Sequence, residues 1–210
     1  MLQAPLPLPV ARGERWFLVL ATALALVWSG IGPNDRLTWS MEVIWVAFGL
    51  PLVIWAWPRF PLTRLLCWLL ALHALLLVVG GHYTYTKVPL GEWFQQTFDL
   101  ERNHYDRLGH FTQGFVPAIL ARELLLRRTL LVPGGWLFYL VLSCCLAFSA
   151  FFEFIEWWAA LLLGGEADAY LATQGDVWDT QWDMFLALVG AFSAQMLLGP
   201  WHNRQLRLGG

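Results

Sequence analysis

Six long apolar runs alternate with shorter polar segments along the chain. They cover about residues 16–31, 39–57, 65–80, 108–126, 136–163 and 182–199. About 20 apolar residues in a helix cross the ~30 Å hydrocarbon core of a bilayer. The pattern therefore predicts an all-α, polytopic membrane helical bundle of about six transmembrane helices. We expect one membrane domain over residues 1–210, with outer loops at 81–107 and 164–181 and a short interfacial helix near 92–98.

Composition agrees with this pattern. Hydrophobic residues make up 58% of the chain and charged residues 13%, whereas soluble domains carry about 25% charged residues. Many of the 14 tryptophans flank the apolar runs, as in the aromatic belts at bilayer interfaces. There is no basic stripe with interleaved aromatic residues, so no nucleic-acid partner is expected. The lipid bilayer is the expected partner, and the oligomeric state stays open.

Lysine and arginine positions predict the orientation. If the N-terminus is inside, nine basic residues fall on the inner side: Arg12, Arg15, Arg59, Arg64, Arg122, Arg127, Arg128, Arg204 and Arg207. Four fall outside: Arg36, Lys87, Arg102 and Arg107. Cytoplasmic segments carry the excess of basic residues in membrane proteins. We therefore expect both termini to be cytoplasmic.

Chemically capable side chains gather at the outer level. With a rise of about 1.5 Å per residue, Glu153 and Glu156 reach the outer edge of the hydrocarbon core. Helices that start outside place Asp106, His110, Asp179 and Asp183 at the same level, and His82, which follows the third apolar run, joins them. Asp106 and His110 share a helix face at a spacing of i, i+4. A polar stripe in a membrane turns towards the bundle interior or a water-filled cavity.

Three interpretations of this set remain open. In the first, it binds a divalent metal, because imidazole with carboxylates suits Zn²⁺ or Mn²⁺ and carboxylates suit Mg²⁺. The metal ligands would be His110, Asp179, Asp183 and His82, and the catalytic acid or base groups Glu153, Glu156 and Asp106. Arg102, Arg107 and His104 would bind an anionic substrate. In the second, the carboxylates pair with the arginines and His110 in a structural or proton-relay network. In the third, they are merely solvated.

The other charged residues suggest simpler roles. Glu123 precedes Arg127 by four residues, which predicts a helix-surface ion pair. His202 lies in the tail and is expected to be solvated. His73, inside an apolar run, is expected to pack in the core. Among these residues we predict no catalytic group.

Two segments carry a resemblance. The first is Gly81-His82-Tyr83-Thr84-Tyr85 with Val88-Pro89-Leu90-Gly91 and the stretch Arg102–Phe111. The second is Glu153-Phe154-Ile155-Glu156-Trp157 followed by Gln174–Met184. With them the chain resembles the YjdF-type family of bacterial inner-membrane proteins over nearly its whole length. The resemblance implies a multi-pass helical bundle in the inner membrane and supplies no reaction.

A weaker resemblance is to VanZ-like membrane proteins. Asp106-Arg107-Leu108-Gly109-His110 is similar to the Asp, basic residue and His that start one of their helices. Asp183 stands where their later pattern has Asn, and Gly190 is displaced. This resemblance would imply action on cell-envelope lipids or glycopeptide sensitivity.

Three functional hypotheses follow. The first is a metal-assisted hydrolase or transferase that acts at the outer leaflet on a lipid or lipid-linked envelope substrate. The second is a small transporter or an ion- or proton-coupled permease, which the sparse polar residues of the inner half disfavour. The third is a non-catalytic envelope protein that binds a partner through its outer loops. Whether the chain is an enzyme stays open at this level.

Overall fold

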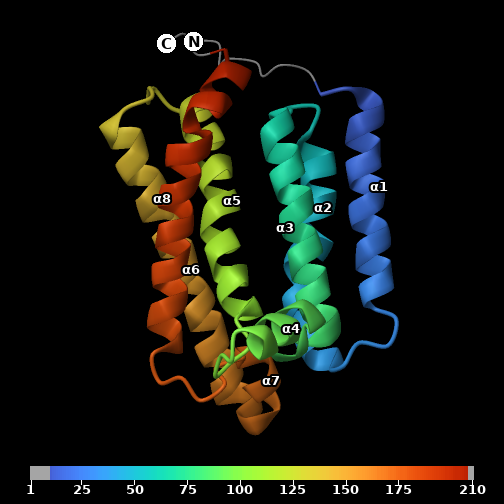
Figure 1. Ribbon diagram of the computed structural model, residues 1–210. Coiled ribbons are helices and arrows are strands. Elements are labelled where there is room, and N and C mark those ends of the chain that lie inside the picture. Colours follow the sequence, from blue (N-terminus) through green and yellow to red (C-terminus); the bar gives the residue numbers. More distant parts are fainter. Residues whose placement is uncertain (1–9, 208–210) are drawn as a thin grey trace.

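The computed structural model describes residues 10–207. Six long helices form an upright bundle, and α1 begins at the same end at which α8 finishes (Figure 1). They are α1 (Arg12–Ser29), α2 (Arg36–Ala56), α3 (Arg64–Tyr83), α5 (Tyr105–Arg128), α6 (Gly135–Leu163) and α8 (Asp179–Gln205). Over residues 10–207 the secondary structure is helical with no strand, which confirms the all-α prediction.

Short elements close the opposite end of the bundle (Figure 1). They are η1 (Tyr85–Lys87), α4 (Pro89–Thr97), η2 (Gly164–Ala167) and α7 (Asp168–Leu171). Helix α4 lies where the sequence predicts a short interfacial helix, but it begins at Pro89. Proline suits the first helical turn, because its missing N–H would have no partner there. The two predicted outer loops are thus partly helical.

Each long helix begins earlier than the apolar pattern alone predicts. Polar caps are one reason: the side chain of Asp35 accepts a hydrogen bond from the Thr38 N–H (2.7 Å), starting α2. Thr63 caps α3 in the same way by accepting from the Leu66 N–H (3.4 Å). The predicted end of the last helix near residue 199 is also too early. Helix α8 continues through Pro200 to Gln205, because buried tertiary contacts hold its final turn.

Four segments are long and apolar enough to cross a membrane. They are Arg36–Ala56, Arg64–Tyr83, Gly135–Leu171 and Asp179–Gln205. Helix α1 carries Arg12, Glu14 and Arg15 in its first turn. Helix α5 has charged residues at both ends, and about half of its residues are buried. Because neighbouring helices shield α5 from lipid, its sequence has no need to be apolar.

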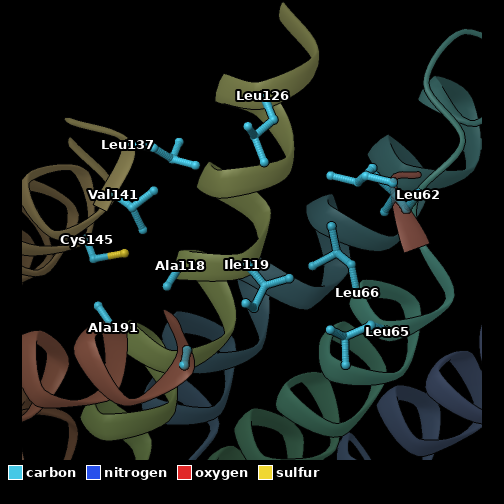
Figure 2. Packing of buried hydrophobic residues seen from close by; sticks show 12 residues of the cluster. Leu62, Leu65, Leu66, Ala118, Ile119, Leu126, Leu137, Val141, Cys145 and Ala191 are labelled. Carbon is cyan, nitrogen blue, oxygen red and sulfur yellow. The ribbon is translucent and has the colours of Figure 1, made fainter. Parts of the chain in front are cut away.

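The long helices form two groups of three. In one group α1 and α2 pack on α3, and in the other α6 and α8 pack on α5. The two groups lie side by side in Figure 1, and they meet mainly where α3 contacts α5. Leu66 and Ile119 pack across this contact, while Leu137, Val141 and Cys145 of α6 pack on the other side of α5 (Figure 2).

Helices α5 and α8 approach each other more closely than any other pair in this core. A Cβ added to Gly114 would lie 1.8 Å from the Ala187 carbonyl oxygen. A Cβ added to Gly190 would lie 2.0 Å from the Phe111 carbonyl oxygen. Small residues permit such close backbone packing between membrane helices. This seam brings the polar first turns of both helices together.

Candidate functional site

A buried polar cluster lies where the first turns of α5 and α8 meet α6. His110 Nε2 is 3.6 Å from Asp106 Oδ1 and 3.7 Å from Asp183 Oδ2. His110 Nδ1 is 3.9 Å from Glu153 Oε1 of α6. All four side chains are at least nine-tenths buried. We call this set, Asp106, His110, Glu153 and Asp183, the outer cluster.

Gln113 orients the imidazole of His110. Its Oε1 lies 2.9 Å from His110 Nδ1, and an amide oxygen can only accept a hydrogen bond. His110 Nδ1 therefore carries the proton. His110 Nε2 then faces Asp106 and Asp183 and is the ring nitrogen that a metal would take, as in metal sites in which a second residue fixes the tautomer of a histidine ligand.

Several carboxylate oxygens of the outer cluster lack a hydrogen-bond donor. Within residues 10–207, Asp106 Oδ2, Asp183 Oδ1 and both Glu153 oxygens are buried without a hydrogen-bond partner. Buried charges are normally paired or bound to a metal, since leaving them bare costs several kcal/mol. Arg102 NH2 lies 3.7 Å from Asp106 Oδ2, an ion pair without a hydrogen bond. Even with this partner, the outer cluster has more acceptors than donors.

The spacing of three ligand atoms fits a metal ion. One atom each from Asp106, His110 and Asp183 lies within 4.8 Å of the other two. The two distances from His110 Nε2, 3.6 and 3.7 Å, are too long for hydrogen bonds. Two ligands that each lie about 2.1 Å from one tetrahedral Zn²⁺ are about 3.4 Å apart. The donor set of one imidazole and two carboxylates also suits Mn²⁺.

A large apolar cavity adjoins the outer cluster, between the two groups of helices. Its volume is about 850 Å³, and Asp106 and His110 line one end of it. Glu42 of α2, Tyr85 of η1 and Glu156 of α6 line the same cavity. At its other end the cavity reaches the basic residues where α1 begins and α5 ends, Arg15 and Arg128.

Glu42 is a site residue that our sequence analysis missed. It lies on α2 and is only 5% exposed. The signal that could have revealed it is a lone carboxylate inside an apolar run, since such residues in membrane helices usually face the protein interior. Tyr85 lies in η1 beside Glu42; burial, and next the charge of Glu42, raise the pKa of Tyr85 well above its usual value. Tyr85 therefore keeps a hydroxyl proton to donate.

The two predicted substrate-binding arginines already have carboxylate partners. Arg102 donates to Asp179 Oδ1 (2.6 Å) and to the Ala172 carbonyl (3.1 Å). Arg107 NH2 donates to Asp176 Oδ2 at 2.7 Å. Asp179, a predicted metal ligand, thus bonds to Arg102 and lies outside the group of three close ligand atoms. These ion pairs connect the start of α5 and the segment before it to the start of α8 and the loop before it, as the network interpretation proposes.

Two histidines predicted to belong to the site, His104 and His82, lie outside the outer cluster. His104 Nδ1 is 3.4 Å from Arg107 NH1; burial, followed by the charges of Arg107 and Arg102, lowers the pKa of His104. A neutral His104 brings no positive charge to an anion. His82 packs against α1: its Nδ1 is 3.0 Å from the Ser29 carbonyl oxygen, and its ring lies 4.5 Å from the Trp28 ring. The structure thus places His82 apart from the outer cluster.

A second buried polar cluster occupies the opposite end of the same two helices. Glu123 is fully buried and accepts hydrogen bonds from Thr63 Oγ1 (2.7 Å) and Arg127 NH1 (2.7 Å). His202 Nε2 is 3.1 Å from Glu123 Oε2. The predicted ion pair between Glu123 and Arg127 is confirmed, but its expected surface location and the expected solvated His202 are wrong, because the end of α8 folds over these groups. We call Thr63, Glu123, Arg127 and His202 the inner cluster.

The fold and the outer cluster define a helical membrane protein with a buried acidic centre that adjoins an apolar cavity. Residues 14–204 match the family described as "Predicted membrane protein (DUF2238)", and the chain belongs to this family. It is 50% identical over 188 residues to the inner membrane protein YjdF of Escherichia coli (strain K12), covering 90% of each chain. No solved structure matches the chain. The chain is thus a multi-pass protein of the bacterial inner membrane, as the sequence predicted.

Proposed function

We propose that the outer cluster binds a divalent metal ion and that the protein is a metal-assisted hydrolase or transferase for a lipid or lipid-linked substrate. The observation that carries the proposal is the convergence of ligand atoms from Asp106, His110 and Asp183 beside carboxylate oxygens without donors in residues 10–207. A divalent ion would offset this excess of buried negative charge.

Each residue has a role in this proposal. Asp106, His110 and Asp183 would hold the metal, and Gln113 keeps a proton on His110 Nδ1 so that Nε2 is the nitrogen left for the metal. Glu153 stands on the far side of the imidazole with both oxygens free of protein donors in the described chain. Glu156 lines the cavity beside Asp106 and His110, and together with Glu153 it is the candidate general base for a water that enters from the cavity. A bound divalent ion supplies Lewis-acid catalysis and lowers the pKa of water.

We also propose six transmembrane helices with both termini in the cytoplasm. Arginines at the end where α1 begins support this orientation, because that end contains Arg12, Arg15, Arg59, Arg64, Arg127, Arg128, Arg204 and Arg207. The outer cluster would then lie at the outer leaflet, and the inner cluster at the cytoplasmic side.

Metal content tests the proposal. We would purify the full chain in detergent without chelator and measure zinc, manganese and magnesium by elemental mass spectrometry. We expect about one ion per chain in the wild type and less than a tenth of that in His110→Ala and Asp183→Asn. His82→Ala is the matched control and should retain the metal, since His82 packs on Trp28. A folded wild type without metal would refute the proposed site.

Activity is the second arm of this test. The metal-loaded protein would be incubated with lipid phosphates, and Glu153→Gln would serve as the variant with its ligands intact. We expect Glu153→Gln to keep the metal and lose about 10²–10⁴-fold in rate, the usual contribution of a general base. Equal rates for wild type and Glu153→Gln would remove Glu153 from the reaction.

A proton- or ion-coupled permease is the second candidate, and one observation favours it. The cavity passes His73 on its way from the outer cluster to Arg15 and Arg128. His73 Nε2 is buried and has no hydrogen-bond partner within the described range. Proteoliposomes with a trapped pH dye would detect proton flux, which His73→Ala should abolish while leaving the metal content unchanged.

A further inference from the structure

The mouth of the apolar cavity faces the lipid. Leu52 of α2 and Leu124 of α5 both line the cavity, yet they are 59% and 42% exposed. Nearer the outer end, Trp45 of α2 closes the gap by packing on Phe148 and Phe152 of α6, with ring centroids 6.2 and 5.9 Å apart. The opening therefore lies between α2 and α5, on the side of this aromatic contact that faces away from the outer cluster.

The cavity is amphipathic along its length. The acidic residues that line it, Glu42, Asp106 and Glu156, gather with His110 at one end. Beyond them the lining is mostly apolar until it reaches Arg15 and Arg128 at the far end. The stretch of α2 from Glu42 to Trp57 is about 22 Å long at about 1.5 Å per residue. A ligand that matches this shape has one polar group and one long apolar chain.

We propose that this cavity binds one hydrocarbon chain of a membrane lipid, which enters sideways between α2 and α5 and holds the lipid's polar group at the outer cluster. The inference rests on the proposed function for the chemistry at the polar group. Binding of the hydrocarbon chain follows from the position of the opening. Leu52 and Leu124 line this opening and are exposed, and the bilayer places hydrocarbon chains against them.

Gly49 offers a clean way to fill the cavity. Glu42, Val46, Gly49 and Val53 share one face of α2 at helical spacing, and all line the cavity. A Cβ added to Gly49 meets nothing within 4 Å, so a larger side chain there enters free space. Gly13 is the matched control: its Cβ also meets nothing within 4 Å, but it is exposed near the start of α1 and does not line the cavity.

The experiment uses a phosphatidic acid whose one acyl chain ends in a diazirine. The full chain is reconstituted into vesicles containing this probe, irradiated, digested and mapped by mass spectrometry. We expect label on cavity-facing residues of α2 and α3, such as Val53 and Ala71. Gly49→Phe should reduce that label at least fivefold relative to label on the exposed Phe192 near the middle of α8, and Gly13→Phe should leave it unchanged.

The two proposals fail separately in this design, because metal content is measured on the same samples. Label in the cavity without bound metal would support the chain site and refute the metal site. Bound metal with label confined to outward-facing residues such as Phe192 would refute the chain site alone. Cavity label that Gly49→Phe leaves undiminished would also overturn the chain site, since that label would not depend on the space beside α2.

Discussion

The outer and inner clusters lie at opposite ends of the same helix pair, yet they differ in how their charges are satisfied. In the inner cluster the Glu123 carboxylate receives hydrogen bonds from Thr63, Arg127 and His202. In the outer cluster, four carboxylate oxygens of Asp106, Glu153 and Asp183 have no donor within the described residues. The buried atoms without a partner in the inner cluster are two nitrogens, Arg127 Nε and His202 Nδ1. Both clusters are buried, so the difference lies in the carboxylate oxygens.

This difference separates a structural role from a functional one. A buried carboxylate with several donors and a basic partner stabilises one packing arrangement and leaves nothing to bind. A group of buried acceptors without donors needs a ligand that offsets its charge, such as a cation. The inner cluster therefore fastens α3, α5 and α8 together, and the outer cluster remains the candidate binding site.

Removing the centre of the inner cluster should have the largest effect on stability. Glu123→Ala leaves Arg127, His202 and the Thr63 N–H buried without their acceptor. We expect a loss of about 3–5 kcal/mol, the usual cost of breaking a buried ion pair. Thermal unfolding in detergent, followed by circular dichroism, measures it. A loss below 1 kcal/mol would show that the inner cluster does not fasten the bundle.

Separating α5 from α8 should disturb both clusters together. Gly114→Ala drives a Cβ into the Ala187 carbonyl oxygen, 1.8 Å away. Overpacking costs about 1–3 kcal/mol, and the clash with rigid backbone puts this substitution at the upper end. Thermal unfolding and metal content should both fall. Gly13→Ala is the control, because its Cβ has open space. Metal binding unchanged in a destabilised Gly114→Ala would mean that the outer cluster does not depend on the seam.

Neutralising a carboxylate of the outer cluster should act in the opposite direction. Without metal, Asp183→Asn removes one buried negative charge that has no arginine or lysine partner in residues 10–207. We expect a gain of about 1 kcal/mol, as when buried charges are replaced by neutral groups. With metal, the wild type should become the more stable of the two proteins. At a metal concentration 100 times the Kd, its free energy of unfolding rises by about 2.7 kcal/mol, and that of the variant does not change. Destabilisation of the metal-free variant would contradict this contrast.

Removing the helix cap Asp35, which lies outside both clusters, should have the smallest effect on stability and serves as the baseline. It caps α2 by accepting from the Thr38 N–H, and Asp35→Ala should cost about 0.5–1 kcal/mol. Hydrogen bonds from Thr38 lower the pKa of Asp35 below its ordinary value. The cap is therefore fully effective above the unfolded pKa of about 3.9 and is lost as pH falls through the lower folded value.

A pair of unfolding curves tests this baseline. The difference between wild type and Asp35→Ala should be constant at neutral pH and vanish in strong acid. An undiminished difference in strong acid would show that the carboxylate charge contributes nothing to the cap.

The sequence by itself determined the membrane bundle and the level of the outer cluster. Apolar runs of sufficient length predict helices because backbone polar groups in lipid must bond within their own segment. Helical rise then predicts depth, which is why Asp106, His110, Glu153 and Asp183 could be named together. The helix ends were less predictable, because capping by Asp35 and the buried turn after Pro200 are decided by single contacts.

Only the tertiary structure decided which polar residues share partners. Rise along a helix gives depth but not the rotation of one helix against another. The sequence therefore could not place His82 on Trp28, pair Asp179 with Arg102, or bury Glu123 against His202. Glu42 belongs to the site because α2 lines the same cavity as α5, which the sequence does not reveal. Such contacts join residues distant in the chain, and among them only those between α5 and α8 depend on the close packing at Gly114 and Gly190.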